Sequence, residues 1–187
     1  MNFLLLPLVV ALASADTCLD SGDRLVNGRC FTLVNQQLSW QDARNWCHYR
    51  NPVAPSSLAT IPDTTTANFI ASYARTSFNT NEGFFWIGLS RNSSTGRFQW
   101  DDGTTLGWTN FGPQNAYTYV AESITNAKFS TYTADAKFNF VCSYYPNAVP
   151  TWAPYTGSTD ASSITETTSL ASTEYTTPPG ISVLNFN

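Results

Sequence analysis

The feature that most restricts the possible folds is a set of four cysteines: Cys18, Cys30, Cys47 and Cys142. They follow an apolar N-terminal run that ends in Ala13-Ser14-Ala15. An apolar run with such a small-x-small end is typical of a secretory signal peptide. We therefore expect residues 1–15 to be removed and the rest to be secreted and extracellular. In that oxidising environment, an even number of cysteines indicates two disulfides.

The spacing of the cysteines leaves three pairings open. Cys18 and Cys30 flank a hairpin pattern, in which Asn27-Gly28 separates two short apolar runs. Asn-Gly is favoured in tight type I′ turns. Such a hairpin brings Cys18 near Cys30, which leaves Cys47 for Cys142. A bridge between Cys47 and Cys142 closes a long loop and by chain entropy stabilises the fold by about 4–5 kcal/mol.

Two patterns along the chain predict helices. Ser39 and Asp63 are suitable N-cap residues, and apolar residues recur at helical spacing over 39–47 and 64–74. Short apolar or alternating runs then predict strands at 84–89, 98–100, 117–124, 128–132 and 138–142. Residues 51–57 have the composition of a loop. Two early helices followed by short strands predict an α+β domain over 16–145.

The composition changes after this domain. Residues 146–187 are rich in Ser, Thr and Pro and contain no Lys or Arg. We expect a disordered tail because so little apolar surface cannot offset the entropy of ordering. In a secreted protein the same composition is typical of an O-glycosylated stalk, and a plain flexible tail is the alternative. The net charge of −4 argues against a nucleic-acid partner, and no later run is long enough for a membrane span.

Several short motifs occur in a fixed order within the domain. They are Trp40-x-x-Ala43-x-x-x-Cys47, Leu58-Ala59-Thr60-Ile61, Asn68-Phe69-Ile70, Trp86-Ile87-Gly88-Leu89, Phe98-x-Trp100-x-Asp102-Gly103, Trp108, and Phe138-x-Phe140-Val141-Cys142. In combination they resemble the C-type lectin-like domain family over about residues 18–144. The resemblance implies two helices flanking two small antiparallel sheets, with a long loop between about Thr104 and Ala121. It also implies the disulfides Cys18–Cys30 and Cys47–Cys142.

The sequence departs from the family pattern at the loop bridge. Members of the family normally carry another disulfide in the long-loop region, and its partners would fall near Tyr119 and Ala134. Neither residue is a cysteine, so we expect the loop to be looser than usual.

The calcium motifs of the family are also altered. The resemblance implies calcium and sugar binding through Glu-Pro-Asn or Gln-Pro-Asp together with Trp-Asn-Asp. The nearest matches here are Gly112-Pro113-Gln114-Asn115 and Phe129-Ser130-Thr131, which contain no carboxylate. Calcium takes six to eight oxygen ligands and favours carboxylates. We therefore expect no cofactor and no high-affinity calcium at the usual place.

Ligand binding would then depend on neutral and aromatic side chains of the long loop. The candidates are Trp108, Asn110, Phe111, Gly112, Pro113, Gln114, Asn115 and Tyr117. Aromatic faces stack on sugars, and amides both donate and accept hydrogen bonds. Aromatic loops suit protein recognition equally well. For Trp108 we expect packing onto the core instead.

Three other features of the sequence are candidate sites. Asn92-Ser93-Ser94 is an N-x-S sequon on a turn, and we expect Asn92 to be N-glycosylated. His48 is the only histidine and has no nucleophile beside it in sequence, so we expect no catalytic site. Asp101-Asp102-Gly103 is typical of a turn, and adjacent carboxylates on a strand would point to opposite faces.

The sequence thus predicts a secreted, non-enzymatic binding module for carbohydrate or extracellular protein ligands. The resemblance also implies a role in innate immune recognition. The alternative is a structural or mucus-like extracellular component, in which an O-glycosylated tail is the active part.

Overall fold

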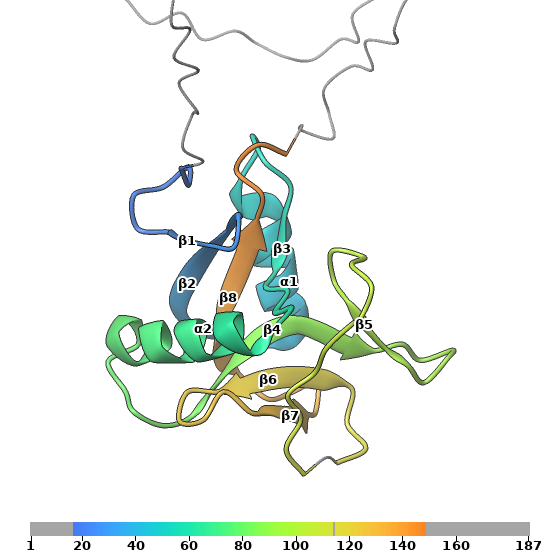
Figure 1. Cartoon of the computed structure of the whole chain (residues 1–187). Coiled ribbons are helices and arrows are strands. Elements are labelled where there is room, and N and C mark those ends of the chain that lie inside the picture. Colours follow the sequence, from blue (N-terminus) through green and yellow to red (C-terminus); the bar gives the residue numbers. More distant parts are fainter. Residues whose placement is uncertain (1–16, 114, 149–187) are drawn as a thin grey trace, which may run out of the picture. The chain divides into compact units, whose positions relative to one another are not determined.

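The computed structural model describes residues 17–113 and 115–148 (Figure 1). The helices in these ranges are α1 (Trp40–Arg50) and α2 (Thr64–Ser77). The strands are β1 (Arg24–Val26), β2 (Arg29–Leu38), β3 (Ser56–Leu58), β4 (Phe84–Arg91), β5 (Phe98–Trp100), β6 (Tyr119–Ser123), β7 (Phe129–Tyr132) and β8 (Phe138–Tyr144). No helix within the described ranges is both long and apolar enough to cross a membrane. The predicted signal peptide and almost all of the predicted tail lie outside the described residues.

Both helices begin where the sequence predicts. Ser39 Oγ accepts a hydrogen bond from the Asp42 backbone N–H (3.2 Å), and Asp63 Oδ1 accepts one from the Thr66 N–H (2.7 Å). Each bond satisfies an N–H group that the first helical turn leaves unpaired. The helices continue past their predicted ends, to Arg50 and Ser77.

The strands form one mixed sheet in the order β1-β2-β8-β4-β6-β7, with β3 also on β8 and β5 on β4. The two antiparallel parts that the sequence predicts are joined by a short parallel pairing of β4 with β8, at Phe85↔Asn139 and Trp86↔Phe140. The interpretation of residues 51–57 as a loop is wrong at its end. Ser56 and Ser57 begin β3, which pairs with β8 and is buried despite its polar composition.

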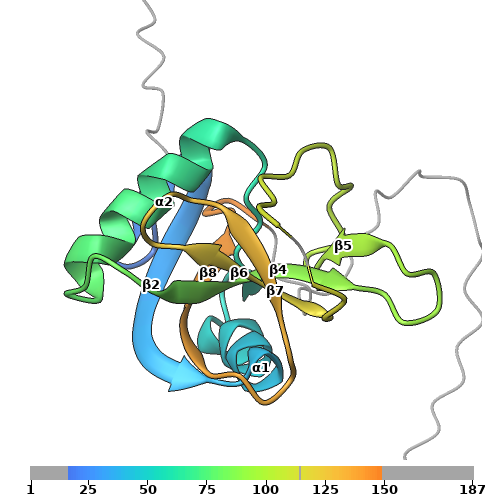
Figure 2. The ribbon, with the colours of Figure 1, turned by 90° about the horizontal axis from the view of Figure 1, so that it is seen from below.

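The helices cover opposite faces of the sheet, as Figure 2 shows. Buried residues of α2, including Ile70 and Ala74, belong to a core with Phe85 and Ile87. Buried residues of α1 belong to a second core around Trp86. Strand β4 therefore contributes to both cores through alternate side chains, which explains its continuous apolar sequence.

Both predicted disulfides are confirmed. Cys18 is joined to Cys30 and Cys47 to Cys142, with Cα–Cα distances of 5.6 and 5.5 Å. The hairpin turn is also confirmed, since Asn27 and Gly28 have φ values of +50° and +77°, as a type I′ turn requires. The long-range bridge holds α1 against β8.

An aromatic pair lies where the family's loop bridge is missing. The ring of Tyr119 is stacked on Trp40, with centroids 4.8 Å apart, and Tyr119 pairs across the sheet with Tyr132. Ala134 is exposed between β7 and β8. At the position near Tyr119, where the family would have one cysteine of the loop disulfide, this protein thus has van der Waals contact between two rings.

Candidate functional site

The long loop is attached to the edge strand β7. The Phe129 N–H donates to the Asn110 carbonyl (2.9 Å), and the Gly112 N–H donates to the Phe129 carbonyl (3.0 Å). Farther along, Thr131 Oγ1 donates to the Asn115 carbonyl (2.8 Å). These bonds fix two points of the loop backbone against the sheet.

Two of the predicted aromatic residues face the core. Trp108 is half-buried and lies edge-on to Phe129, with ring centroids 5.8 Å apart. Phe111 contacts Phe98 and Phe129, at 4.9 and 5.7 Å. The structure therefore supports the packing role expected for Trp108 and gives Phe111 a similar role. Both rings hold the loop in place and leave ligand contact to other residues.

The exposed part of the loop is its later portion. Pro113, Asn115 and Tyr117 are exposed, and Tyr117 retains 45% of its accessible surface. Gly112 is half-buried. Gln114 lies outside the described residues. An exposed amide and an exposed phenol ring thus lie two residues apart in the part of the loop that we call the loop tip (residues 113 and 115–117).

The side chain of Asn110 has a structural role. Its Nδ2 donates to the Ala127 carbonyl (2.8 Å), and its Oδ1 accepts a hydrogen bond from Lys128 Nζ (2.7 Å). Asn110 therefore ties the loop to the β6–β7 turn. Sequence reasoning missed Lys128, although a lysine just before the degenerate Phe129-Ser130-Thr131 motif is itself a signal against a cation site.

The residues near the loop do not fit calcium. A calcium site needs oxygen ligands, several of them carboxylates. The described loop residues 104–113 and 115–118 include no Asp or Glu. The Lys128 ammonium instead lies against Asn110. Within 17–113 and 115–148, no group of three or more His, Cys, Asp or Glu side chains is placed to hold a metal. The expectation of calcium-free binding remains a prediction for experiment.

The paired aspartates lie in the turn after β5, where their side chains contact different groups. Asp102 caps the expected turn by accepting from the Thr104 N–H (2.9 Å), and it also accepts from Arg29 (2.8 Å). Burial works against ionisation of Asp102, but these hydrogen bonds outweigh it and lower the pKa of the carboxyl group.

Asp101 is more than a turn residue, which sequence reasoning missed. Its side chain is only 2% exposed and accepts hydrogen bonds from Arg44 Nε and the Leu58 N–H. His48 Nε2 lies 2.8 Å from Oδ2 of the same carboxylate. Asp101 therefore joins α1 to β3 and β5, and the lone histidine takes part in this structural cluster.

The sequon lies on the turn between β4 and β5. Asn92 is partly exposed, and its Oδ1 accepts hydrogen bonds from the N–H groups of Ser94 and Thr95, both at 2.9 Å. Ser93 and Ser94 are exposed. The turn is therefore accessible for modification, and occupancy of Asn92 by a glycan stays a prediction.

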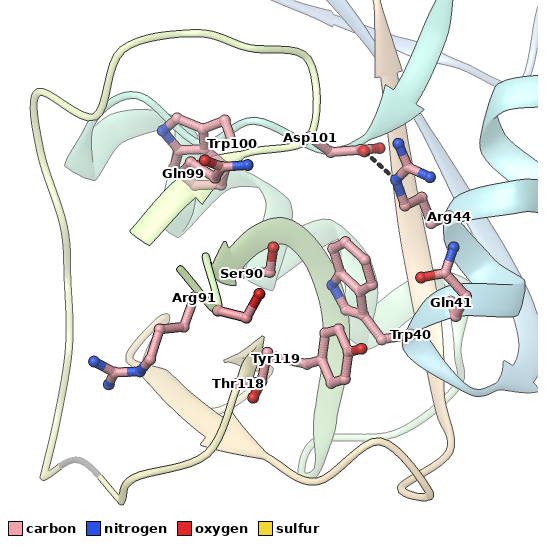
Figure 3. Close-up of a pocket in the computed structure, with 11 residues that line it drawn as sticks. Trp40, Gln41, Arg44, Ser90, Arg91, Gln99, Trp100, Asp101, Thr118 and Tyr119 are labelled. Carbon is pink, nitrogen blue, oxygen red and sulfur yellow. Dashed lines mark hydrogen bonds and ion pairs between the residues drawn. The ribbon is translucent and has the colours of Figure 1, made fainter. Parts of the chain in front are cut away.

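A concave surface beside α1 is another candidate site, which the sequence did not predict. It is an open cavity of about 340 Å³ formed by the start of α1, the end of β4, β5 and the start of β6 (Figure 3). The stacked Trp40–Tyr119 pair forms part of its wall. Because its residues come from four separate elements, their proximity is visible only in the fold.

Comparisons with known proteins agree with this architecture. Residues 36–144 match the family model of the lectin C-type domain. One chain of the snaclec anticoagulant protein of Deinagkistrodon acutus is 28% identical over 144 residues, which cover 77% of this chain and 94% of that protein. One chain of the snaclec coagulation factor IX/factor X-binding protein of Gloydius halys is 26% identical over 144 residues, with the same coverage of 77% and 94%.

Solved structures show the same fold. The C-type lectin CEL-I from Cucumaria echinata superimposes with a TM-score of 0.62 at 19% identity, over 67% of this chain and 96% of that chain. The names of these proteins describe an anticoagulant protein, a coagulation factor-binding protein and a lectin. Since the family model matches more than half of the sequence, the chain belongs to the C-type lectin domain family.

Proposed function

We propose that this protein is a secreted binding module that recognises a carbohydrate or protein ligand through its loop tip, without calcium. The observation that carries the proposal is the hydrogen bond from Lys128 Nζ to Asn110 Oδ1 (2.7 Å). A protein cation stabilises the base of the loop, where a calcium-dependent site would need anionic ligands. The exposed residues beyond it are then free to contact a ligand.

The chemistry of the loop tip suits either ligand class. Tyr117 offers a large exposed ring with a hydroxyl group, and Asn115 offers both a donor and an acceptor. A relative named as a coagulation factor-binding protein supports protein recognition, and the lectin CEL-I supports carbohydrate recognition. Innate immune recognition is the role that such an extracellular module would serve.

A glycan array with and without EDTA, run on the mature chain, tests this proposal. We expect binding that survives EDTA and that the Tyr117→Ala variant loses. Tyr49→Ala is the matched control, because Tyr49 is 87% exposed on α1 and lies outside the loop. The same pair of variants applies to a panel of extracellular proteins.

Three outcomes would count against the proposal. EDTA-sensitive binding would indicate a calcium-dependent lectin, and equal loss in both tyrosine variants would exclude the loop tip. Absence of binding on both panels would favour the structural or mucus-like role, in which the Ser/Thr/Pro-rich segment 146–187 is the active part.

A further inference from the structure

The cavity beside α1 carries opposed cationic groups. Arg44 comes from α1 and Arg91 from the end of β4, and both line the cavity. Figure 3 shows their side chains on opposite sides of it, with the Ser90 side chain between them. This concentration of positive charge is notable in a chain with a net charge of −4.

The single acidic residue among the lining residues is neutralised by its neighbours. The Asp101 carboxylate accepts hydrogen bonds from Arg44 Nε and the Leu58 N–H, and His48 Nε2 lies 2.8 Å away. Arg44 uses only Nε in this contact, so its two terminal nitrogens keep their hydrogen-bonding capacity. The cavity lining therefore has a net positive charge.

Arg91 is incompletely satisfied. One terminal nitrogen donates to the Gly96 carbonyl (3.2 Å), and the guanidinium lies 4.4 Å above the Phe98 ring. Its Nε, however, is shielded from solvent and has no hydrogen-bond partner among the described residues. Because Nε is shielded, a ligand in the cavity can reach only the terminal nitrogens of Arg91, one of which already donates to the Gly96 carbonyl.

The remaining wall is typical of carbohydrate recognition. Ser90 and Thr118 contribute hydroxyl groups, and Gln41 and Gln99 contribute amides. These groups both donate and accept, as vicinal sugar hydroxyls require. The volume of about 340 Å³ is at the small end of the usual range for ligand pockets, roughly 300–1,000 Å³. It suits one sugar ring.

We propose that this cavity is a second binding site, for one sugar residue that bears a carboxylate, such as a hexuronic or sialic acid. The carboxylate would bind the terminal nitrogens of Arg91, with Arg44 across the cavity adding positive charge, and the ring hydroxyls would bind the serine, threonine and glutamine side chains. The site shares no residue with the loop tip, which ends just before Thr118, and it needs no metal. It therefore stands whether or not the loop tip binds a ligand.

Matched sugars test the chemical class. Methyl glucuronide and methyl glucoside differ only at C6, which is a carboxylate in the first and a hydroxymethyl group in the second. Methyl sialoside is a second acidic sugar of different shape. Each is titrated into the mature chain in EDTA, with binding followed by saturation-transfer NMR. We expect saturable binding of an acidic sugar and at least tenfold weaker binding of the glucoside, because hydrogen bonds to charged groups are the stronger ones. Equal binding of glucuronide and glucoside, or no binding of either acid, would overturn the proposal.

Variants test whether the acidic sugar binds in this cavity. Arg91→Gln should weaken binding of the acidic sugar about tenfold, whereas Arg97→Gln, which removes an exposed charge on the same hairpin outside the cavity, should change it less than twofold. Gln99→Glu adds a carboxylate at an exposed cavity position and should also weaken binding. Equal effects of Arg91→Gln and Arg97→Gln, with both variants folded, would exclude the site.

Two further arms separate this site from its alternatives. Tyr117→Ala should leave binding of the acidic sugar unchanged, and loss of binding in that variant would assign it to the loop tip. Inorganic sulfate should compete only weakly with the sugar. If sulfate displaces it fully at equal concentration, the cavity binds anions in general and the proposed sugar specificity is wrong.

Discussion

Glu122 occupies a position on β6 where an apolar residue would be expected. Its cross-strand neighbours are Phe85 and Phe129, both fully buried. The Glu122 side chain is itself fully buried, and neither carboxylate oxygen has a hydrogen-bond partner among the described residues. Loss of hydration raises the pKa of Glu122 well above its usual value.

This environment predicts a pH-dependent effect of Glu122→Met, which keeps the length of the side chain. The raised pKa means that the unfolded chain releases the proton first, so the wild-type free energy of unfolding falls as pH rises above about 4.5. The variant lacks this loss. Urea unfolding should show a stability gain at pH 7.5 that exceeds the gain at pH 4.

The exposed Glu82 provides the control. Glu82→Met should change stability by less than about 0.5 kcal/mol at both pH values, as is usual for surface sites. A destabilised Glu122→Met protein at pH 7.5, or a gain independent of pH, would contradict the account of the buried carboxylate.

At the scale of elements, β4 crosses the strand β3 at close range. The Gly88 N–H donates to the Ala59 carbonyl (2.8 Å), and a Cβ atom at Gly88 would lie 2.4 Å from the Leu58 carbonyl oxygen. The atom in the way belongs to backbone, which cannot move aside as a side chain can. The glycine of Trp86-Ile87-Gly88-Leu89 is therefore required by this crossing.

Gly88→Ala should consequently lower the free energy of unfolding by about 3 kcal/mol or more. Gly107→Ala is the control, since a Cβ there meets nothing within 4 Å. Thermal melts of the two variants measure the difference. Equal melting temperatures would show that β3 and β4 are not so closely opposed.

The N-terminal hairpin is held to the domain by a buried polar contact. Tyr144 on β8 donates its hydroxyl to Asp23 (2.7 Å) and accepts from the Leu19 N–H (2.9 Å). Burial and the hydrogen bond to Asp23 raise the pKa of Tyr144 to about 12. Its neutral form therefore stabilises the fold below pH 10, and this contribution is lost between about pH 10 and 12.

Tyr144→Phe should lower the free energy of unfolding at pH 7 by about 1–3 kcal/mol, because Asp23 loses a buried donor. The deficit relative to wild type should shrink as pH rises from 10 to 12. Tyr73→Phe serves for comparison, since it removes an exposed hydroxyl group whose hydrogen bond to the Gly22 carbonyl (3.2 Å) can be replaced by water. A deficit that is constant over this alkaline range would refute the assigned role of the phenol.

Elements with strong local signals could be predicted from sequence. The capped helices and the Asn27-Gly28 hairpin depend on neighbouring residues, so their patterns are readable along the chain. Strand β3 could not be predicted, because Ser56 and Ser57 have little strand propensity and are held in place by β8.

At the scale of the whole molecule, the two disulfides and the family resemblance were enough to predict the architecture. The site was predicted less well. The sequence shows that carboxylates are absent from the loop and predicts that Trp108 packs onto the core, but it does not show that Phe111 packs inward as well. Contacts such as Lys128 with Asn110, or Arg44 with Asp101, join residues far apart in the chain. Only the tertiary structure brings these pairs together.

We propose that the long loop of this fold binds its ligand without a calcium ion. Isothermal titration of the mature, EDTA-treated chain with calcium chloride tests it most directly. The Lys128 ammonium and the lack of carboxylates on the described loop residues predict no heat of binding at micromolar calcium. A single site with micromolar affinity would contradict the claim and restore a calcium-dependent mechanism.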